Sequence, residues 1–331
     1  MKKEKEQEHE ALAELRKKYG ADVISRASEG YPPVSAISTG CFAIDRVIGV
    51  GGIPRGRLME LYGDPSSGKT ATSLFIISEV QKQGGDCAFV DAEFSFNGDF
   101  AKAIGVDTTK LFVSQPATLE EGMDTIRALV ATNQIDLIVL DSIAALVPKR
   151  EVEGEEMLAN SSFAVQAQLM SKALRILTGE IARSKTCVIL INHLKEKMGV
   201  TWGDKTTTPG GKSAKFFSSV RLAVSKGEKI KGKGDEQIGS VVKIVAQKNK
   251  IAPPWRKGEF TLYYNTGVDL AADTLDTATE LKVISKEGNT LSFGEVKLGA
   301  GRDKAIDALK NDEILYEKIH QATTEAVKAE K

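Results

Sequence analysis

The chain of 331 residues has no net charge at neutral pH, because 45 lysine and arginine residues balance 45 aspartate and glutamate residues. A chain without a global positive field does not recruit nucleic acid by charge alone, so any basic surface must be local. The chain also lacks an apolar run of roughly 18 or more residues, and its N-terminus is charged. We therefore expect a cytoplasmic protein with neither a signal peptide nor a membrane span.

Cysteine is scarce as well. Cys41, Cys87 and Cys187 lie far apart among apolar neighbours, and their spacing is not that of metal ligands. An odd number of separated cysteines indicates reduced thiols in a core rather than a disulfide framework. The sequence shows no internal repeat or low-complexity tract, and its length allows a large core with a small second domain beside it.

A glycine-rich segment organises the chain. It follows the apolar run 58–62, precedes the predicted helix 71–77, and consists of Gly63, Asp64, Pro65, Ser66, Ser67, Gly68, Lys69 and Thr70. In a strand, loop and helix of this kind, backbone N–H groups surround phosphate oxygens, the lysine supplies a cation, and the threonine hydroxyl can bind Mg²⁺. The alternative is an ordinary turn that contains lysine, but the flanking strand and helix argue against it. The segment predicts nucleoside-triphosphate binding.

Short apolar strands alternate with helices after this loop. This alternation predicts a parallel sheet covered on both faces, hence an α/β fold. The predicted strands are 87–90, 135–140 and 186–191, and the predicted helices are 100–104, 119–133 and 163–183. Three later segments alternate apolar and polar residues, as antiparallel strands at a sheet edge do. These segments are 220–224, 241–247 and 260–264.

Acidic residues end two of the predicted parallel strands. Asp141 follows one apolar strand and Glu93 ends another. Because ligands of parallel sheets bind beyond the carboxyl ends of the strands, both side chains are expected beside the phosphate loop. Asp141 is placed to orient Mg²⁺ and its water shell, and Glu93 to orient or deprotonate an attacking water molecule. Either acid could instead be a helix cap or a surface residue.

The two ends of the chain differ from this core. A charged amphipathic helix is predicted over 6–19, with Gly20 as its stop, and 30–33 forms a linker. This helix could pack on its own domain or dock on a neighbouring subunit. Beyond about residue 267 we expect a small α+β domain. Its predicted elements are helices at 275–284, 304–309 and 314–327 and a small strand pair that includes 290–293.

Several motifs together resemble those of bacterial RecA recombinases, in the same order. They are Ile37–Gly40, Gly63–Thr70, Asp91–Glu93, Val139–Ser142, Thr206–Gly211 and Lys248–Pro253. The resemblance implies a RecA-type P-loop ATPase core with a mostly parallel sheet over 36–267, an N-terminal helical arm over 1–35 and a C-terminal domain over 268–331. It further implies an ATP- and Mg²⁺-dependent recombinase that forms helical filaments of identical subunits on single-stranded DNA and pairs it with homologous double-stranded DNA.

The same resemblance assigns roles to individual residues. Glu93 matches the family's catalytic glutamate, Lys69 and Thr70 match its phosphate- and Mg²⁺-binding residues, and Asp141 matches the acid that orients Mg²⁺ and its water shell. Lys248 and Lys250 match lysines that reach the ATP of the neighbouring subunit, although the residues alone favour solvated lysines on an edge strand. Phe100 replaces a tyrosine near the adenine. His193 replaces a glutamine thought to sense the γ-phosphate, and an imidazole can also gain a proton near neutral pH.

Two loops, about 151–162 and 194–211, correspond to the family's DNA-binding loops. Basic residues, an aromatic side chain and glycines suit contact with a sugar-phosphate backbone and stacked bases. The DNA-binding residues that we predict are Ser171, Arg175, Lys195, Lys197, Trp202, Gly210, Gly211 and Lys212. The first loop is longer than usual, Gln168 stands where an arginine is expected, and Trp202 replaces a phenylalanine. These departures suggest a divergent member of the family, for example one encoded by a phage.

Two other function classes use the same phosphate loop. A ring-forming motor such as a replicative helicase would usually place an arginine in trans and carry a different N-terminal domain. A kinase-like phosphotransferase would need an acceptor site and a lid. The ordered set of motifs favours the recombinase. The ending Thr324–Lys331 has balanced charge where the family has an acidic tail, so we expect weaker self-restraint of DNA uptake.

Overall fold

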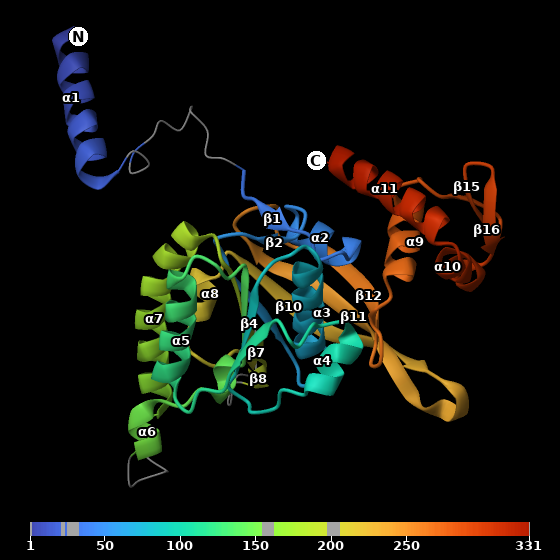
Figure 1. Ribbon diagram of the computed structural model, residues 1–331, viewed down its shortest axis with the longest axis horizontal. Coiled ribbons are helices and arrows are strands. Elements are labelled where there is room, and N and C mark those ends of the chain that lie inside the picture. Colours follow the sequence, from blue (N-terminus) through green and yellow to red (C-terminus); the bar gives the residue numbers. More distant parts are fainter. Residues whose placement is uncertain (1, 21–23, 25–32, 154–161, 197–205, 331) are drawn as a thin grey trace. The chain divides into compact units, whose positions relative to one another are not determined.

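The computed structural model describes residues 2–20, 24, 33–153, 162–196 and 206–330 (Figure 1). The chain divides into two compact units, Met1–Val34 and Ser35–Lys331. Among the described residues, no helix combines the length and the apolar character that a membrane crossing requires. The predicted DNA contacts Lys197 and Trp202 lie outside the described residues.

The first unit is built around helix α1 (Lys2–Tyr19). The predicted helix began at Glu6, so the observed one starts earlier. Its end matches the predicted stop, because the Gly20 amide donates to the carbonyl of Arg16 at 2.9 Å with φ at 104°. A left-handed residue directly after the last turn is a common helix ending that glycine adopts without strain. Leu15 and Tyr19 of this helix are exposed.

The second unit is centred on a sheet that has nine strands within the described residues, in the order β13-β12-β11-β10-β3-β7-β6-β4-β5. Strands β10, β3, β7, β6, β4 and β5 are parallel, and β11, β12 and β13 add antiparallel strands. The bounds are β3 Leu58–Gly63, β4 Cys87–Asp91, β5 Leu111–Ser114, β6 Leu137–Asp141, β7 Cys187–His193, β10 Val220–Lys231, β11 Gln237–Asn249, β12 Lys257–Tyr263 and β13 Gly267–Val268. The predicted mostly parallel α/β sheet is therefore confirmed. Strand β5 was missed, because it is short and exposes Phe112 and Val113.

Helices cover both faces of this sheet, as Figure 1 shows. One apolar cluster joins the sheet to α2 (Phe42–Ile48), α3 (Lys69–Lys82) and α4 (Gly98–Ile104). The opposite cluster joins it to α5 (Leu119–Ala131), α7 (Ser162–Ser184) and α8 (Ser213–Phe217). Since each strand is buried on two sides, the central strands are apolar almost throughout, which is why they could be read as continuous runs.

Short elements lie near the predicted DNA loops. Helix α6 (Lys149–Glu153) occupies the start of the first predicted loop. Strands β8 (Lys195–Glu196) and β9 (Thr206–Thr207) pair with each other inside the second. The described parts of both segments therefore contain regular structure, which the sequence did not reveal.

Strands β1 (Ala36–Ile37) and β2 (Ile53–Pro54) form a further pair before β3.

The C-terminal part has its own apolar cluster. Its elements are α9 Leu270–Glu280, β14 Ser285–Glu287, β15 Thr290–Phe293, β16 Val296–Ala300, α10 Arg302–Asn311 and α11 Glu313–Ala329. The predicted helix over 275–284 was displaced, because the observed helix ends at Glu280 and a strand begins at Ser285. The expected strand pair is part of a three-stranded sheet within the described residues.

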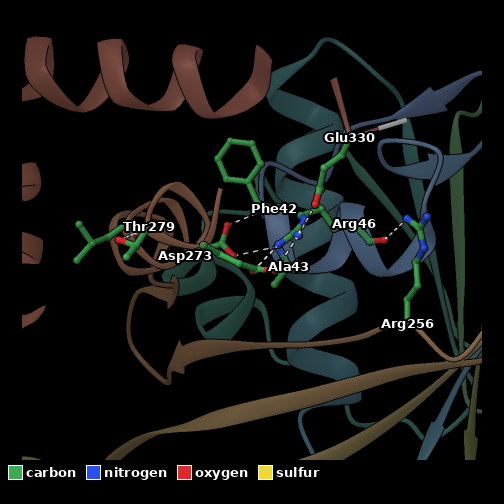
Figure 2. A network of polar contacts seen from close by, with 9 residues as sticks. Phe42, Ala43, Arg46, Arg256, Asp273, Thr279 and Glu330 are labelled. Atoms are coloured by element: carbon green, nitrogen blue, oxygen red, sulfur yellow. Dashed lines mark hydrogen bonds and ion pairs between the residues drawn. The ribbon is translucent and has the colours of Figure 1, made fainter. Parts of the chain in front are cut away.

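Helix α9 is fastened to α2 by charge and hydrogen bonds (Figure 2). The buried Asp273 carboxylate accepts from the amides of Phe42 at 2.6 Å and Ala43 at 3.0 Å. Amides in the first turn of a helix have no partner within the helix, so this carboxylate satisfies two of them. Arg46 binds Glu280 through both guanidinium amino groups, at 2.7 and 3.0 Å, and one of these groups also reaches Glu330 at 3.2 Å.

Candidate nucleotide-binding and hydrolytic site

The phosphate loop joins β3 to α3. Gly63 ends the strand, and a Cβ atom added there would lie 2.0 Å from the carbonyl oxygen of Val224. Gly68 precedes the first turn of α3 with φ at 96°. Both glycines are therefore required by the path of the backbone. The loop ends on the first turn of a helix of 14 residues, where unpaired N–H groups and the helix dipole favour an anion.

Lys69 is almost fully buried within this loop. Its ammonium donates to the carbonyls of Gly63 at 3.1 Å and Asp64 at 2.8 Å. Burial lowers the pKa of Lys69, although the nearby carboxylates of Asp141 and Glu93 partly offset the change. The cation thus lies inside the curve of the loop, where an anionic phosphate oxygen would stabilise its charged form.

Thr70 and Asp141 face each other across the start of α3 and the end of β6. The Thr70 hydroxyl donates to Asp141 Oδ2 at 2.5 Å. Burial raises the pKa of Asp141 to about 6, against the effect of this hydrogen bond. Hydroxyl and carboxylate oxygens are suitable for Mg²⁺, which usually keeps several waters and binds few protein groups beside substrate phosphates. The described residues contain no cluster of three or more His, Cys, Asp or Glu side chains that could enclose a metal.

Glu93 lies at the centre of a second cluster at the same sheet edge. Ser142 Oγ donates to Glu93 Oε1 at 2.6 Å, and His193 Nε2 lies 2.9 Å from the same oxygen. Burial alone would raise the pKa of Glu93, but the hydrogen bonds from Ser142 and His193 outweigh it, so its pKa lies below the ordinary value. The carboxylate is therefore ionised at neutral pH and able to orient a water molecule or accept its proton.

Strand register brings these groups together. Asp91 pairs with Asp141 across β4 and β6, and Gly63 pairs with His193 across β3 and β7. The amides of Ala92 and Glu93 both donate to the carbonyl of Asp141, at 2.7 and 3.2 Å. The turn that carries Glu93 is thus fixed to the end of the neighbouring strand.

Lys248 and Lys250 contact another part of the second unit: both bind backbone carbonyls of α8. Lys248 donates to the carbonyls of Lys215 and Phe216, and Lys250 donates to that of Phe216 at 3.2 Å. Both ammonium groups thus lie at the C-terminal end of α8, where cations are favoured. Lys248 lies near the end of β11 and pairs with Arg221 of β10, whereas Lys250 follows this strand and is exposed.

Most predicted DNA contacts that the structure describes are exposed. Ser171 and Arg175 project from α7, Lys195 lies on β8, and Lys212 precedes α8. Phe100, predicted to lie near the adenine, is half-buried on α4 and packs against the core.

Packing within the fold requires glycine at positions 210 and 211. A Cβ atom at Gly210 would lie 2.8 Å from Ile143 Cγ2, and one at Gly211 would lie 2.9 Å from Ala167 Cβ. Both residues also have positive φ, at 78° and 72°. Close packing against Ile143 and against Ala167 of α7 therefore requires glycine at both positions, whether or not a nucleic acid approaches.

Four residues with contacts at this edge of the sheet were given no role from the sequence, although Ser142 and Asn192 belong to polar strand endings that were expected beside the phosphate loop. Ser142 holds Glu93, and its only signal was its place directly after Asp141. Asn192 donates to Glu60 Oε1 at 3.0 Å and to the carbonyl of Pro209 at 3.2 Å. Glu60 in turn binds Arg221. A charged residue inside an otherwise apolar strand was the signal that could have identified these last two.

The site combines a phosphate loop at the edge of a parallel sheet, two oxygen groups suitable for Mg²⁺ and an ionised glutamate. These features define a P-loop nucleoside triphosphatase. The family model described as RecA N-terminal domain matches residues 6–269, and the one described as RecA C-terminal domain matches residues 272–328. The chain belongs to the RecA family.

Individual relatives agree with this assignment. Protein RecA of Clostridium tetani is 45% identical over 309 residues, which covers 93% of this chain and 87% of that protein. Protein RecA of Bacillus thuringiensis is 44% identical over 310 residues, with 93% and 90% covered. Among solved structures, the RadB recombinase has a TM-score of 0.52 at 21% identity and covers 70% of this chain and 98% of its own, which supports the fold.

The geometry around Glu93 makes a direct prediction for nucleotide hydrolysis. Glu93→Gln keeps the size of the side chain and can still accept from Ser142, but it cannot take a proton. We expect nucleotide binding to persist and turnover to fall by roughly 10²–10⁴, the usual contribution of a positioned base. Binding of a fluorescent nucleotide and steady-state phosphate release measure the two effects. Near-normal phosphate release would assign the base to another group.

Proposed function

We propose that this protein is an ATP-dependent recombinase that forms helical filaments on single-stranded DNA and catalyses homologous pairing and strand exchange. The observation that carries the proposal is the position of two consecutive residues on β7. His193 contacts Glu93 with its ring, while Asn192 binds the Pro209 carbonyl at the exit of the second predicted DNA loop. A change at the phosphate end can therefore be transmitted to that loop through one short piece of backbone.

ATP hydrolysis at this site uses the groups described above. The amides of the phosphate loop and Lys69 bind the phosphates, and Thr70 with Asp141 would hold Mg²⁺ directly or through its waters. When bound, Mg²⁺ neutralises charge on the phosphate oxygens. Glu93, kept ionised by Ser142 and His193, orients the attacking water and accepts its proton. Phe100 offers an aromatic face for the adenine.

Lys248 and Lys250 would act on the ATP of the adjacent subunit. Within one chain both bind the C-terminal end of α8. Phe216 of the same helix is 67% exposed, so it is free to pack against an adjacent subunit at this place. Positive charge supplied from a neighbour stabilises the charge that spreads over the transferred phosphoryl group. Helix α1, with exposed Leu15 and Tyr19, is the arm expected to join the subunits.

The proposal is tested by ATP hydrolysis with and without single-stranded DNA, combined with electron microscopy of the same samples. We expect DNA-stimulated hydrolysis, open helical filaments, and joint molecules when a homologous duplex is added. The Glu93→Gln variant should form filaments that persist with ATP. Closed rings would favour a motor of the helicase type, and DNA-independent hydrolysis by single chains would contradict the recombinase.

The trans role of the lysines predicts complementation between two inactive variants. Lys248→Ala should bind ATP normally and lose DNA-stimulated turnover by on the order of 10³, as the loss of a trans cation does in other phosphoryl-transfer enzymes. Mixing it with Glu93→Gln creates interfaces that pair an intact Lys248 with an intact Glu93, so part of the turnover should return. Mixtures that stay as inactive as either variant alone would place the complete site within one chain.

A third prediction concerns His193 as the link between nucleotide and DNA. His193→Ala should bind ATP but lose the difference in single-stranded DNA affinity between the ATP-analogue and ADP states. His193→Gln retains a hydrogen-bond donor and should restore that difference. DNA affinity in both nucleotide states, measured by fluorescence anisotropy, gives the answer. An alanine variant whose two affinities differ as much as those of the parent would refute the role.

A further inference from the structure

A buried ion pair lies in the sheet next to the strand that carries Lys248. Glu60 on β3 is fully buried, and the Arg221 side chain on β10 is 10% exposed. Arg221 Nε donates to Glu60 Oε2 at 2.5 Å. The strand register aligns Arg221 with Glu60 on one side and with Lys248 on the other. Glu60, Arg221 and Lys248 therefore occupy neighbouring positions in three adjacent strands.

Other contacts fix this pair in place. The Arg221 guanidinium lies 4.2 Å from the centre of the Tyr62 ring, and the Tyr62 hydroxyl donates to Gln247 Oε1 at 2.5 Å. Gln247 directly precedes Lys248. On the other side, the Asn192 amide donates to the second oxygen of Glu60. The pair thus connects the strand of His193 with the strand of the two lysines.

Stability alone does not explain such a pair. The cost of removing two charges from water often exceeds their attraction, so apolar residues of similar size stabilise a fold at least as well. The pair is also incompletely satisfied, because Arg221 Nη2 is buried without a hydrogen-bond partner among the described residues. A buried donor without a partner destabilises the fold. The arrangement therefore suggests a role other than holding the sheet together.

The charges around Lys248 indicate what this role is. Burial, the neighbouring Lys250 and Arg221 lower the pKa of Lys248 to about 8, whereas Glu60 acts to raise it. The Lys248 ammonium also lies against the backbone carbonyls at the end of α8. If Arg221 were absent, Glu60 would be a buried anion without a cation. Lys248 lies on β11, the strand on the other side of β10, and is paired there with position 221.

We propose that Arg221 is a positioning residue for Lys248: it neutralises Glu60, so that the lysine stays at the end of α8 and is available to the neighbouring subunit. The inference rests on the proposed trans role of Lys248. Arg221 itself touches neither nucleotide nor DNA in this scheme. Its effect is to prevent the capture of Lys248 by a carboxylate of its own chain.

The first experiment measures the titration of Lys248 without nucleotide or DNA. Competitive acetylation between pH 7 and 11, resolved at Lys248 by peptide fragmentation, reports its pKa in the folded chain. In Arg221→Met we expect the midpoint to rise by about one pH unit or more, since a like charge is removed and a carboxylate is left unpaired. Adding Glu60→Gln to this variant should reverse the rise.

Two further variants keep this test decisive. Glu60→Gln alone retains a hydrogen bond to Arg221 and should lower the Lys248 midpoint, which can be checked even if Arg221→Met does not fold. Arg302→Met removes an arginine from an exposed ion pair with Asp276 in the C-terminal part and should leave the midpoint unchanged. An unchanged Lys248 midpoint in both Arg221→Met and Glu60→Gln would overturn the proposal.

The second experiment measures turnover. Arg221→Met should bind ATP as the parent does but lose DNA-stimulated hydrolysis tenfold or more, and Glu60→Gln should restore it. Mixing Arg221→Met with Glu93→Gln should also restore activity, because the defect lies on the donating side of the interface. Loss of ATP binding, or no recovery in these mixtures while Lys248→Ala mixtures recover, would overturn the positioning role. Full activity of Lys248→Ala would instead contradict the proposed function. The acetylation result would then still show whether Arg221 and Glu60 act on Lys248 within one chain.

Discussion

The site depends on the alignment of parallel strand ends at one edge of the sheet. Strands β3, β4, β6 and β7 are neighbours in space, although β7 begins more than a hundred residues after β3 ends. Their register places Asp91 beside Asp141 and Gly63 beside His193. Because parallel strands all end at the same edge, the phosphate loop and the polar residues that follow the strands necessarily converge there. Any slip of one strand would separate Glu93 from its two hydrogen-bond partners.

The same alignment gives β7 one contact with Glu93 and one with the Pro209 carbonyl. In β7 the side chain of Asn192 points to the face covered by α8, where it meets Glu60 and the Pro209 carbonyl. The next residue, His193, lies at the phosphate side and contacts Glu93. Successive side chains of a strand point to opposite faces. One dipeptide therefore reaches both places, which is the structural basis of the proposed link between nucleotide and loop.

The chemistry at strand ends could be predicted from the sequence, because the phosphate loop, Asp141 and Glu93 are marked by local patterns of apolar strand followed by polar residue. The buried ion pair next to this site could not. Glu60 and Arg221 are 161 positions apart, and their contact exists only because β10 inserts beside β3. The displaced helix near residue 280 has a different cause, since the run after Glu280 remains partly apolar and no proline marks the helix end.

Charge placement at the lysines shows how one sheet can serve two sites. In the proposed trans role Lys248 acts as a cation, yet burial lowers its pKa, and a fully buried carboxylate lies two strands away. A fold that simply paired Lys248 with Glu60 would gain a local contact and lose a mobile charge. In this proposal Arg221 resolves the conflict because its guanidinium stacks on Tyr62 while binding the carboxylate. Among the described residues, the ammonium of Lys248 donates to backbone carbonyls at a helix end, whose partial charge is weaker than that of a carboxylate. Under the proposed function, a triphosphate on the adjacent subunit would compete for this ammonium.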